Sequence, residues 1–174
     1  MKKLLFATCF ILAFAACKKE KNNPPPDNPY GLPNATTEGK NIFACRVNGE
    51  NWIVQNSIYT LGGGVQNDTL SVSGSYDGNN YFHRLTLYIS ENIVSGNSYN
   101  INSFNRILLS ANWTPCNGAM GSNVINQFAT SGQIILTKYD ADNKIISGKF
   151  SCRIPIPNCD TLNITDGRFD IRYY

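Results

Sequence analysis

The stretch Thr130–Tyr174, TSGQIILTKYDADNKIISGKFSCRIPIPNCDTLNITDGRFDIRYY, decides the fold of this chain, because it reads as successive antiparallel strands joined by tight turns. Between residues 145 and 154 a mainly apolar set of side chains alternates with a mainly polar set: Ile146, Gly148, Phe150, Cys152 and Ile154 against Ile145, Ser147, Lys149, Ser151 and Arg153. A period of two residues is that of a strand with one buried face. The stretch therefore predicts three or four antiparallel strands.

The last of these strands changes phase part of the way along, since its apolar residues before and after the change have opposite parity: Leu162 and Ile164, then Phe169, Ile171 and Tyr173. A one-residue slip keeps both sets on one face, so we expect a β-bulge or a tight turn at Asp166-Gly167. Three charged residues are expected to line the opposite, outer face, where pairing among them is worth little and no functional explanation is needed: Arg168, Asp170 and Arg172.

Working outward, the preceding chain alternates in shorter segments, and strands are predicted over residues 42–47, 52–59, 69–76, 81–90, 98–101 and 107–113. Asn48-Gly49 marks the first hairpin, because both turn positions need positive φ. Gly62-Gly63-Gly64 is interpreted as a flexible loop, since neither Gly-Lys-Ser/Thr nor a helix follows it. Asn occurs 23 times and Gly 14 times, which favours turns over helices. Residues 42–174 are thus expected to form one all-β domain, an antiparallel β-sandwich or flattened barrel of about nine strands.

Residues 1–16 have the pattern of a signal peptide. Two lysines precede a mainly apolar run from Leu4 to Ala16, which is shorter than the roughly 20 residues of a membrane span. The run ends LAFAAC (residues 12–17), which resembles a bacterial lipoprotein signal, where the cysteine is acylated and becomes the first residue of the mature chain. Ordinary cleavage after Ala15 is the alternative, but it would leave Cys17 as an unpaired thiol. We therefore predict lipidation at Cys17.

Residues 17–41 are predicted to be the lipidated cysteine and a Pro/Asn-rich tether. Residues 18–23 are polar, and the prolines that follow disfavour both a core and a helix. Such a segment favours polyproline II, with about 3.1 Å per residue, and would hold the domain away from the membrane. The lipid would make a membrane one partner and place the protein in the cell envelope. The outer membrane is expected, and the side that the protein faces is left open.

Four cysteines remain when Cys9 leaves with the signal and Cys17 takes the lipid: Cys45, Cys116, Cys152 and Cys159. In an exported chain they suggest two disulfides, with three connectivities. A Cys152–Cys159 bridge across the Pro-rich turn would leave Cys45 to pair with Cys116, and its short loop favours this scheme. The alternative joins Cys45 with Cys152 and Cys116 with Cys159.

Composition argues against several classes of function. The formal charge of +3 falls to +1 without Lys2 and Lys3, leaving 13 basic and 12 acidic residues, so nucleic acid is not an expected partner. His83 is the one histidine, and there is no Cys-x-x-Cys pair, so we predict no metal site and no cofactor. His83 is interpreted as a packed, hydrogen-bonded residue. Residues 140–143 (DADN) lack the Gly and Glu of an EF-hand and are interpreted as a turn.

The longest irregular segment is residues 114–126, and long loops carry function more often than strands do. Together with Trp113 and Tyr76 or Tyr81, this loop would form an aromatic surface on which sugars could stack. The alternative is an ordinary disulfide-pinned loop, because singly exposed aromatic residues are common.

Three motifs resemble those of an uncharacterised, domain-of-unknown-function family of exported lipoproteins from Bacteroidetes-type bacteria: RVNGENW (residues 46–52), LTKYD running on to NKIISGKF (residues 136–150) and NITDGRFD (residues 163–170). The resemblance covers roughly residues 40–174 and implies a single β-rich lipoprotein domain at the cell envelope. It assigns no catalytic or binding residue.

No nucleophile–base pair or cluster of carboxylates stands out, so we expect a non-catalytic binding or structural module, for a glycan or an envelope protein, rather than an enzyme. One alternative is a glycan-acting hydrolase, which needs two carboxylates about 5–10 Å apart in a cleft. Another is a carrier of a small apolar ligand. Clustered carboxylates would favour the hydrolase, and an empty apolar interior would favour the carrier.

Overall fold

The computed structural model describes residues 28–54, 60–78, 81–101, 107–113 and 125–174. These residues form eleven strands and no helix: β1 (Ile42–Val47), β2 (Glu50–Ile53), β3 (Leu61–Gln66), β4 (Thr69–Gly78), β5 (Tyr81–Ile89), β6 (Ser98–Ile101), β7 (Ile107–Trp113), β8 (Ile125–Phe128), β9 (Ser131–Asp140), β10 (Ile145–Ile154) and β11 (Leu162–Arg172). In this part of the chain, therefore, no helix is long and apolar enough to cross a membrane.

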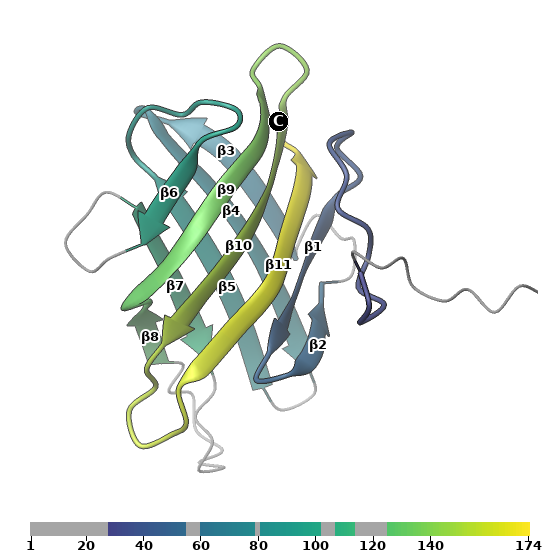
Figure 1. The fold of residues 1–174 in the computed structure, drawn as a ribbon. Helices are drawn as coiled ribbons and strands as arrows, with labels where there is room; N and C mark the ends of the chain where they lie inside the picture. The colour runs from purple at the N-terminus through teal and green to yellow at the C-terminus, as the bar shows by residue number, and fades with distance from the viewer. Residues whose placement is uncertain (1–27, 55–59, 79–80, 102–106, 114–124) are drawn as a thin grey trace, which may run out of the picture.

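The strands form two antiparallel sheets that pack face to face (Figure 1). The six-stranded sheet has the order β2-β1-β11-β10-β9-β6, and the five-stranded sheet has the order β3-β4-β5-β7-β8. Neither sheet closes on itself, so the architecture is a sandwich and not a barrel. The predicted all-β sandwich is confirmed, with eleven strands in place of about nine.

The core lies between the two sheets, where alternate residues of each strand are buried. Its largest fully buried side chains come from both layers: Phe43, Phe169, Ile134, Leu136, Ile146 and Ile154 from the six-stranded sheet, and Leu70, Leu85, Leu87, Ile89 and Leu109 from the five-stranded sheet. Phe43 contacts Phe150 at a ring-centroid distance of 5.3 Å, and Phe150 lies 6.3 Å from Phe169. The aromatic residues of three neighbouring strands therefore meet beneath the middle of the six-stranded sheet.

The predicted slip in the last strand is confirmed as a β-bulge. Along β10 and β11 the pair Phe150–Gly167 is followed by Cys152–Ile164, so β11 carries one extra residue. The pairing of β1 with β11 shifts at the same place, and Asp166 has φ +53°. Because of the bulge, the apolar residues on both sides of it face the core.

The interpretation of Gly62-Gly63-Gly64 as a flexible loop is wrong, because these residues form most of β3. They pair in register with Ser73, Val72 and Ser71 of β4. A Cβ on Gly63 would lie 3.2 Å from Ile171 Cγ2, so the missing side chain lets the two sheets approach closely here. The β3–β4 hairpin turns at Asn67-Asp68, whose φ values of +49° and +56° resemble those of Asn48-Gly49 in the first hairpin.

The described part of the predicted tether, residues 28–41, packs on the outer face of the six-stranded sheet; we call it the strap. In Figure 1 the strap runs beside β1 and β11. Asn28 and Leu32 are buried, and Arg168 of β11 donates a hydrogen bond to Pro33 O at 3.1 Å. The folded domain therefore extends back to Asn28, and the extended spacer predicted for residues 18–41 is shorter by this segment.

Candidate functional site

The carboxylate of Asp170 on β11 accepts most of the hydrogen bonds that join the C-terminal half of the strap to the sheet. Its oxygens accept hydrogen bonds from strap groups at 2.5–3.1 Å: Thr36 Oγ1 and the backbone N–H groups of Glu38, Gly39 and Lys40. Ser147 Oγ of β10 donates a further bond at 2.6 Å. Burial by itself would raise the pKa of Asp170, but the hydrogen bonds from Lys40, Ser147, Thr36 and Gly39 outweigh it and hold the pKa below its ordinary value.

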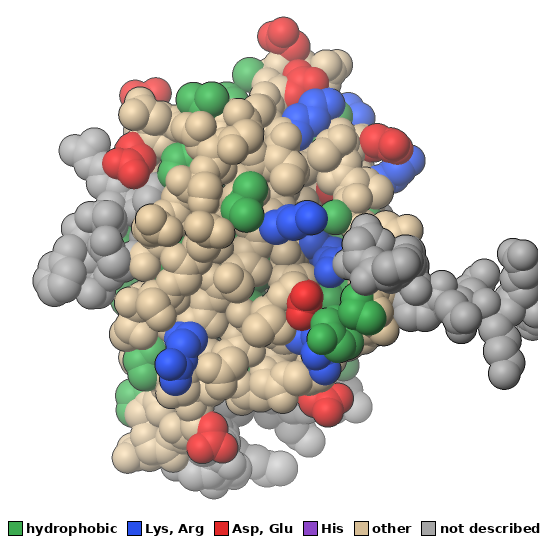
Figure 2. Space-filling view, in the orientation of Figure 1, with side chains coloured by type: hydrophobic (Ala, Val, Ile, Leu, Met, Phe, Trp, Pro, Cys, Tyr) green, Lys and Arg blue, Asp and Glu red, His purple; other side chains and the backbone are tan. Residues whose placement is uncertain are grey.

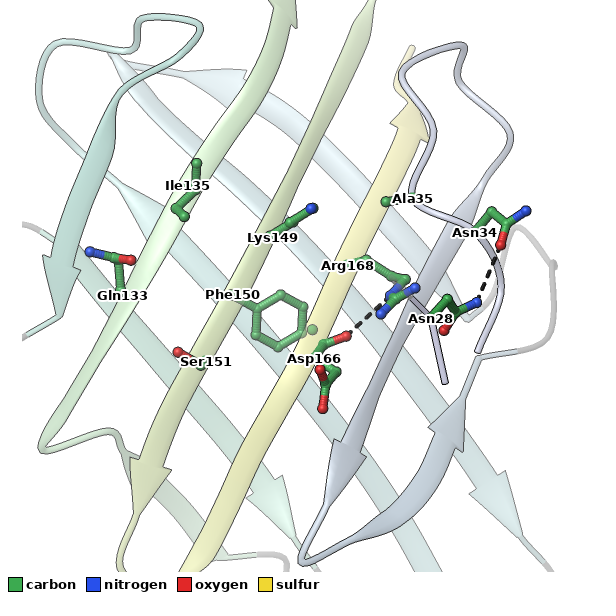
Figure 3. A pocket seen from close by; sticks show the side chains of 11 residues that line it. Asn28, Asn34, Ala35, Gln133, Ile135, Lys149, Phe150, Ser151, Asp166 and Arg168 are labelled. Atoms are coloured by element: carbon green, nitrogen blue, oxygen red, sulfur yellow. Dashed lines mark hydrogen bonds between the residues drawn. The ribbon is translucent and has the colours of Figure 1, made fainter. Parts of the chain in front are cut away.

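Next to this attachment, a pocket of about 490 Å³ opens on the outer face of the six-stranded sheet. The strap forms one wall of the pocket through Asn28, Asn34 and Ala35. The sheet forms the floor through residues of β9, β10 and β11: Gln133, Ile135, Lys149, Phe150, Ser151, Asp166, Gly167 and Arg168. Figure 3 shows these side chains spread over β9, β10 and β11 beside the strap. The pocket is therefore outside the core of the sandwich, between the sheet and the segment that precedes it in sequence.

The bulge shapes the floor of this pocket. Gly167 follows the bulge residue Asp166 and lies opposite Phe150 of β10. A Cβ on Gly167 would come within 2.5 Å of Phe150 O and 2.7 Å of the Phe150 ring. Because Gly167 has no side chain, the ring of Phe150, only 4% exposed, packs over the Gly167 backbone on the core side, and both residues line the pocket.

Two cations lie side by side in the pocket, Lys149 on β10 and Arg168 on β11. They are direct cross-strand partners, and Figure 3 shows the Arg168 guanidinium directed toward the strap. Arg168 is 9% exposed, donates from Nε to Asp166 O and from Nη1 to Pro33 O at 3.1 Å each, and has no carboxylate of a described residue within salt-bridge distance. The pocket thus contains a buried positive charge that forms no salt bridge with a described carboxylate.

The strap wall carries an unusual amide. Asn28 is 4% exposed, and its Nδ2 donates to Leu32 O at 2.5 Å and to Asn34 Oδ1 at 3.2 Å. Its Oδ1 is buried without a hydrogen-bond partner among the described residues. A buried acceptor without a donor costs free energy, so this position of the strap wall is energetically unfavourable as it stands.

The three charged residues of β11 line the outer face of the sheet, as predicted, but two of them have contacts that the sequence did not indicate. Asp170 is 1% exposed and Arg168 is 9% exposed, because the strap covers them. Arg172 remains exposed and donates to Asn143 O and Glu38 O. The sequence did not reveal the cover, because the prolines before Asn34 are typical of a solvated spacer.

The predicted aromatic surface is described only in part. The side chains of Trp113 and Tyr81 and the loop 114–124 lie outside the described residues. Tyr76 is half-buried on β4 and packs against the core. The pocket under the strap is on the other sheet, so the described aromatic residue is not part of it.

The cysteines do not follow the favoured disulfide scheme. Cys45 and Cys152 are free, buried thiols, so the Cys152–Cys159 and Cys45–Cys116 bridges are absent, as is Cys45–Cys152 of the alternative. Cys45 on β1 and Cys152 on β10 point into the core from strands that β11 separates, about 9 to 10 Å across, which is too far for a disulfide. Cys159 is disulfide-bonded, whereas Cys116 and Cys17 lie outside the described residues.

The other polar residues considered in the sequence analysis, His83 and Asp140, lie within strands or turns of the fold. His83 is half-buried on β5, and burial lowers its pKa to about 4, so its imidazole is neutral at pH 7. Asp140 accepts two hydrogen bonds from Asn143 at 2.9 Å, which confirms the predicted hairpin turn. Within the described ranges, no three His, Cys, Asp or Glu side chains gather as a metal site would require.

Comparison with known proteins adds no relative. No family model matches this chain, and no curated protein or solved structure is detectably similar to it.

Proposed function

We propose that this protein is a non-catalytic binding module of the cell envelope, attached to a membrane through lipidated Cys17, with the pocket under the strap as its ligand site. The pocket is the observation that carries the proposal. It has a volume of about 490 Å³, within the range of ligand sites, and it is lined by amides, a hydroxyl and charged groups. The strap that forms its wall is also the segment that leads back toward the anchor.

The alternatives receive less support from the described residues. A glycan-acting hydrolase of the usual kind places two carboxylates across a cleft, whereas Asp166 is the one carboxylate among the residues that line the pocket. A carrier of an apolar ligand needs an empty apolar interior, whereas apolar side chains from both sheets occupy the described interior. A binding module needs neither feature.

The attachment is tested by the intact mass and the membrane partition of the natively expressed protein beside Cys17→Ala. We expect a mass increment of two or three acyl chains on Cys17, and we expect membrane partition to be lost in the variant. An unmodified chain that stays in the soluble fraction would overturn the envelope attachment.

The ligand site is tested by cosedimentation of the purified protein with polysaccharide isolated from the cell envelope. Ala35→Trp places a large side chain in the pocket from an exposed strap position and should abolish binding. Ala141→Trp makes the same change in the exposed β9–β10 turn and should leave binding unchanged. Equal binding by the two variants would exclude the pocket as the binding site.

A further inference from the structure

We propose that the pocket under the strap binds an acidic saccharide, whose carboxylate lies against Lys149 and Arg168 while its hydroxyl groups bond the surrounding amides. This inference rests on the proposed binding function and specifies its ligand. Figure 2 shows the face of the six-stranded sheet as mainly uncharged, with Lys and Arg side chains near its middle.

The first argument is the pair of cations. Like charges directly opposite on neighbouring strands destabilise a sheet, and Lys149 and Arg168 occupy such a pair of positions on two central strands. Burial of Arg168 adds to this cost, because a charge removed from water needs a partner. Asp166 brings one carboxylate to the pocket against these two cations, so an anionic group would supply the missing charge.

The second argument is the geometry of the guanidinium. Arg168 uses Nε and Nη1 for two backbone carbonyls, and these bonds fix its plane between the bulge and the strap. Nη2 has no hydrogen-bond partner among the described residues, and Arg168 lines the pocket. A fixed guanidinium with a free N–H group is suited to a carboxylate, because charge-assisted hydrogen bonds are the stronger ones.

The third argument is the polar lining around the cations, which suits hydroxyl groups. The side chains of Asn34, Gln133 and Ser151 offer both donors and acceptors. Asp166, exposed at the pocket, accepts hydrogen bonds only. A ligand with one carboxylate and several hydroxyl groups matches this combination better than a simple anion does.

A peptide ligand fits this position less well. Peptides commonly add a strand to the open edge of a sheet. The pocket, in contrast, lies over β9, β10 and β11, each of which already pairs with a strand on both sides. A peptide bound there could not form backbone hydrogen bonds with a strand edge and would be held by side-chain contacts alone. A saccharide has no peptide backbone and is bound through side-chain contacts at any site.

The test measures binding of defined probes to the full mature protein in detergent micelles, by calorimetry and by amide chemical shifts. The probes are trigalacturonic acid, a glucuronate oligosaccharide and sialyllactose, each beside its methyl ester, together with acetate, inorganic phosphate and a capped acidic tripeptide. We expect at least one acid to shift the amides of Lys149 and Gly167 and its ester to bind about tenfold more weakly or worse.

The matched variants remove one positive charge each from the outer face of β10. Lys149→Gln should weaken binding of the acid about fivefold or more and reduce its dependence on salt, because the lost contact is a charge pair. Arg153→Gln removes an exposed charge on the same strand outside the pocket and should leave binding unchanged. Both positions are exposed, so neither change threatens the fold.

Several results would overturn the inference. Acetate or phosphate binding as tightly as the saccharides would reduce the pocket to a simple anion site, and tighter binding of the tripeptide would assign it to a protein partner. If no acid binds better than its ester while Ala35→Trp still abolishes binding to envelope polysaccharide, the inference fails and the proposed function stands. If Ala35→Trp has no effect either, both fail.

Discussion

At the scale of the single residue, Asp170 determines whether the strap stays on the sheet. Asp170→Ala leaves three strap N–H groups and the Ser147 hydroxyl without their acceptor, so we expect unfolding free energy to fall by about 2–4 kcal/mol. Urea denaturation at pH 7 measures the loss. Asp142→Ala, in the exposed β9–β10 turn, is the control and should change stability by less than about 0.5 kcal/mol. Equal stability of the two variants would contradict the role of Asp170.

His83 makes the stability of the fold depend on pH in a separate range. Its folded pKa of about 4 lies below the ordinary value, so the fold favours the neutral imidazole. The stability that this provides is complete above about pH 6.5 and is lost as the pH falls toward 4. His83→Gln should flatten this part of the stability profile, and the single imidazole signal in the proton spectrum should titrate near pH 4. A midpoint near 6.5 would contradict the burial. The contribution of Asp170 is also lost as the pH falls, because its hydrogen bonds hold its pKa below the ordinary value for an aspartate.

The two free thiols are protected by the same core. Burial raises the pKa of Cys152 to about 12, and burial, with a smaller effect of Cys152, raises the pKa of Cys45 further. We expect iodoacetamide to label neither residue in the native protein and to label both after unfolding without a reductant. Mass spectrometry of the non-reduced digest measures this and identifies the partner of Cys159, which we expect to be Cys116. Rapid labelling of the native protein would contradict the burial.

At the scale of the strand, we expect alanine substitutions at two glycines to have different effects on stability, because one glycine lies in the packed bulge and the other on an open edge. Gly167→Ala places a Cβ 2.5 Å from Phe150 O and should destabilise the protein by about 1–3 kcal/mol. Gly64→Ala, on edge strand β3, meets nothing within 4 Å and should be neutral or stabilising by up to about 1 kcal/mol. Thermal unfolding of both variants measures the contrast. Equal effects would show that the bulge tolerates a side chain.

These strands also show what the sequence predicts and what it does not. The bulge in β11 is predictable, because apolar residues on opposite parities must reach one core. Strand β3 is not predictable from alternation, because three consecutive glycines carry no pattern. Its only signal is Asn67-Asp68, a pair that suits a tight hairpin turn, followed by the alternation of β4.

At the scale of the whole molecule, the class of fold can be predicted from the period-two alternation of apolar residues. The pocket cannot, because it depends on strand register and on contacts between residues far apart in sequence. Lys149 and Arg168 lie on outer faces, as their parities predict, but only the register of β10 against β11 places them opposite each other. The strap covers Arg168 through bonds between residues more than 130 positions apart in sequence, such as Arg168 to Pro33. A local pattern carries no information about such pairing, so the sequence alone predicts a solvated tether for residues 28–41.

The strap has a mechanical consequence. A pull on the chain before Asn28 reaches the strap first, and its bonds to β11 would be loaded one after another instead of together. The bond from Arg168 to Pro33 comes before the group at Asp170, so the wall of the pocket would peel away while the attachment at Asp170 and the sandwich still hold. Tension on the N-terminal segment would thereby release whatever the pocket holds before it threatens the fold.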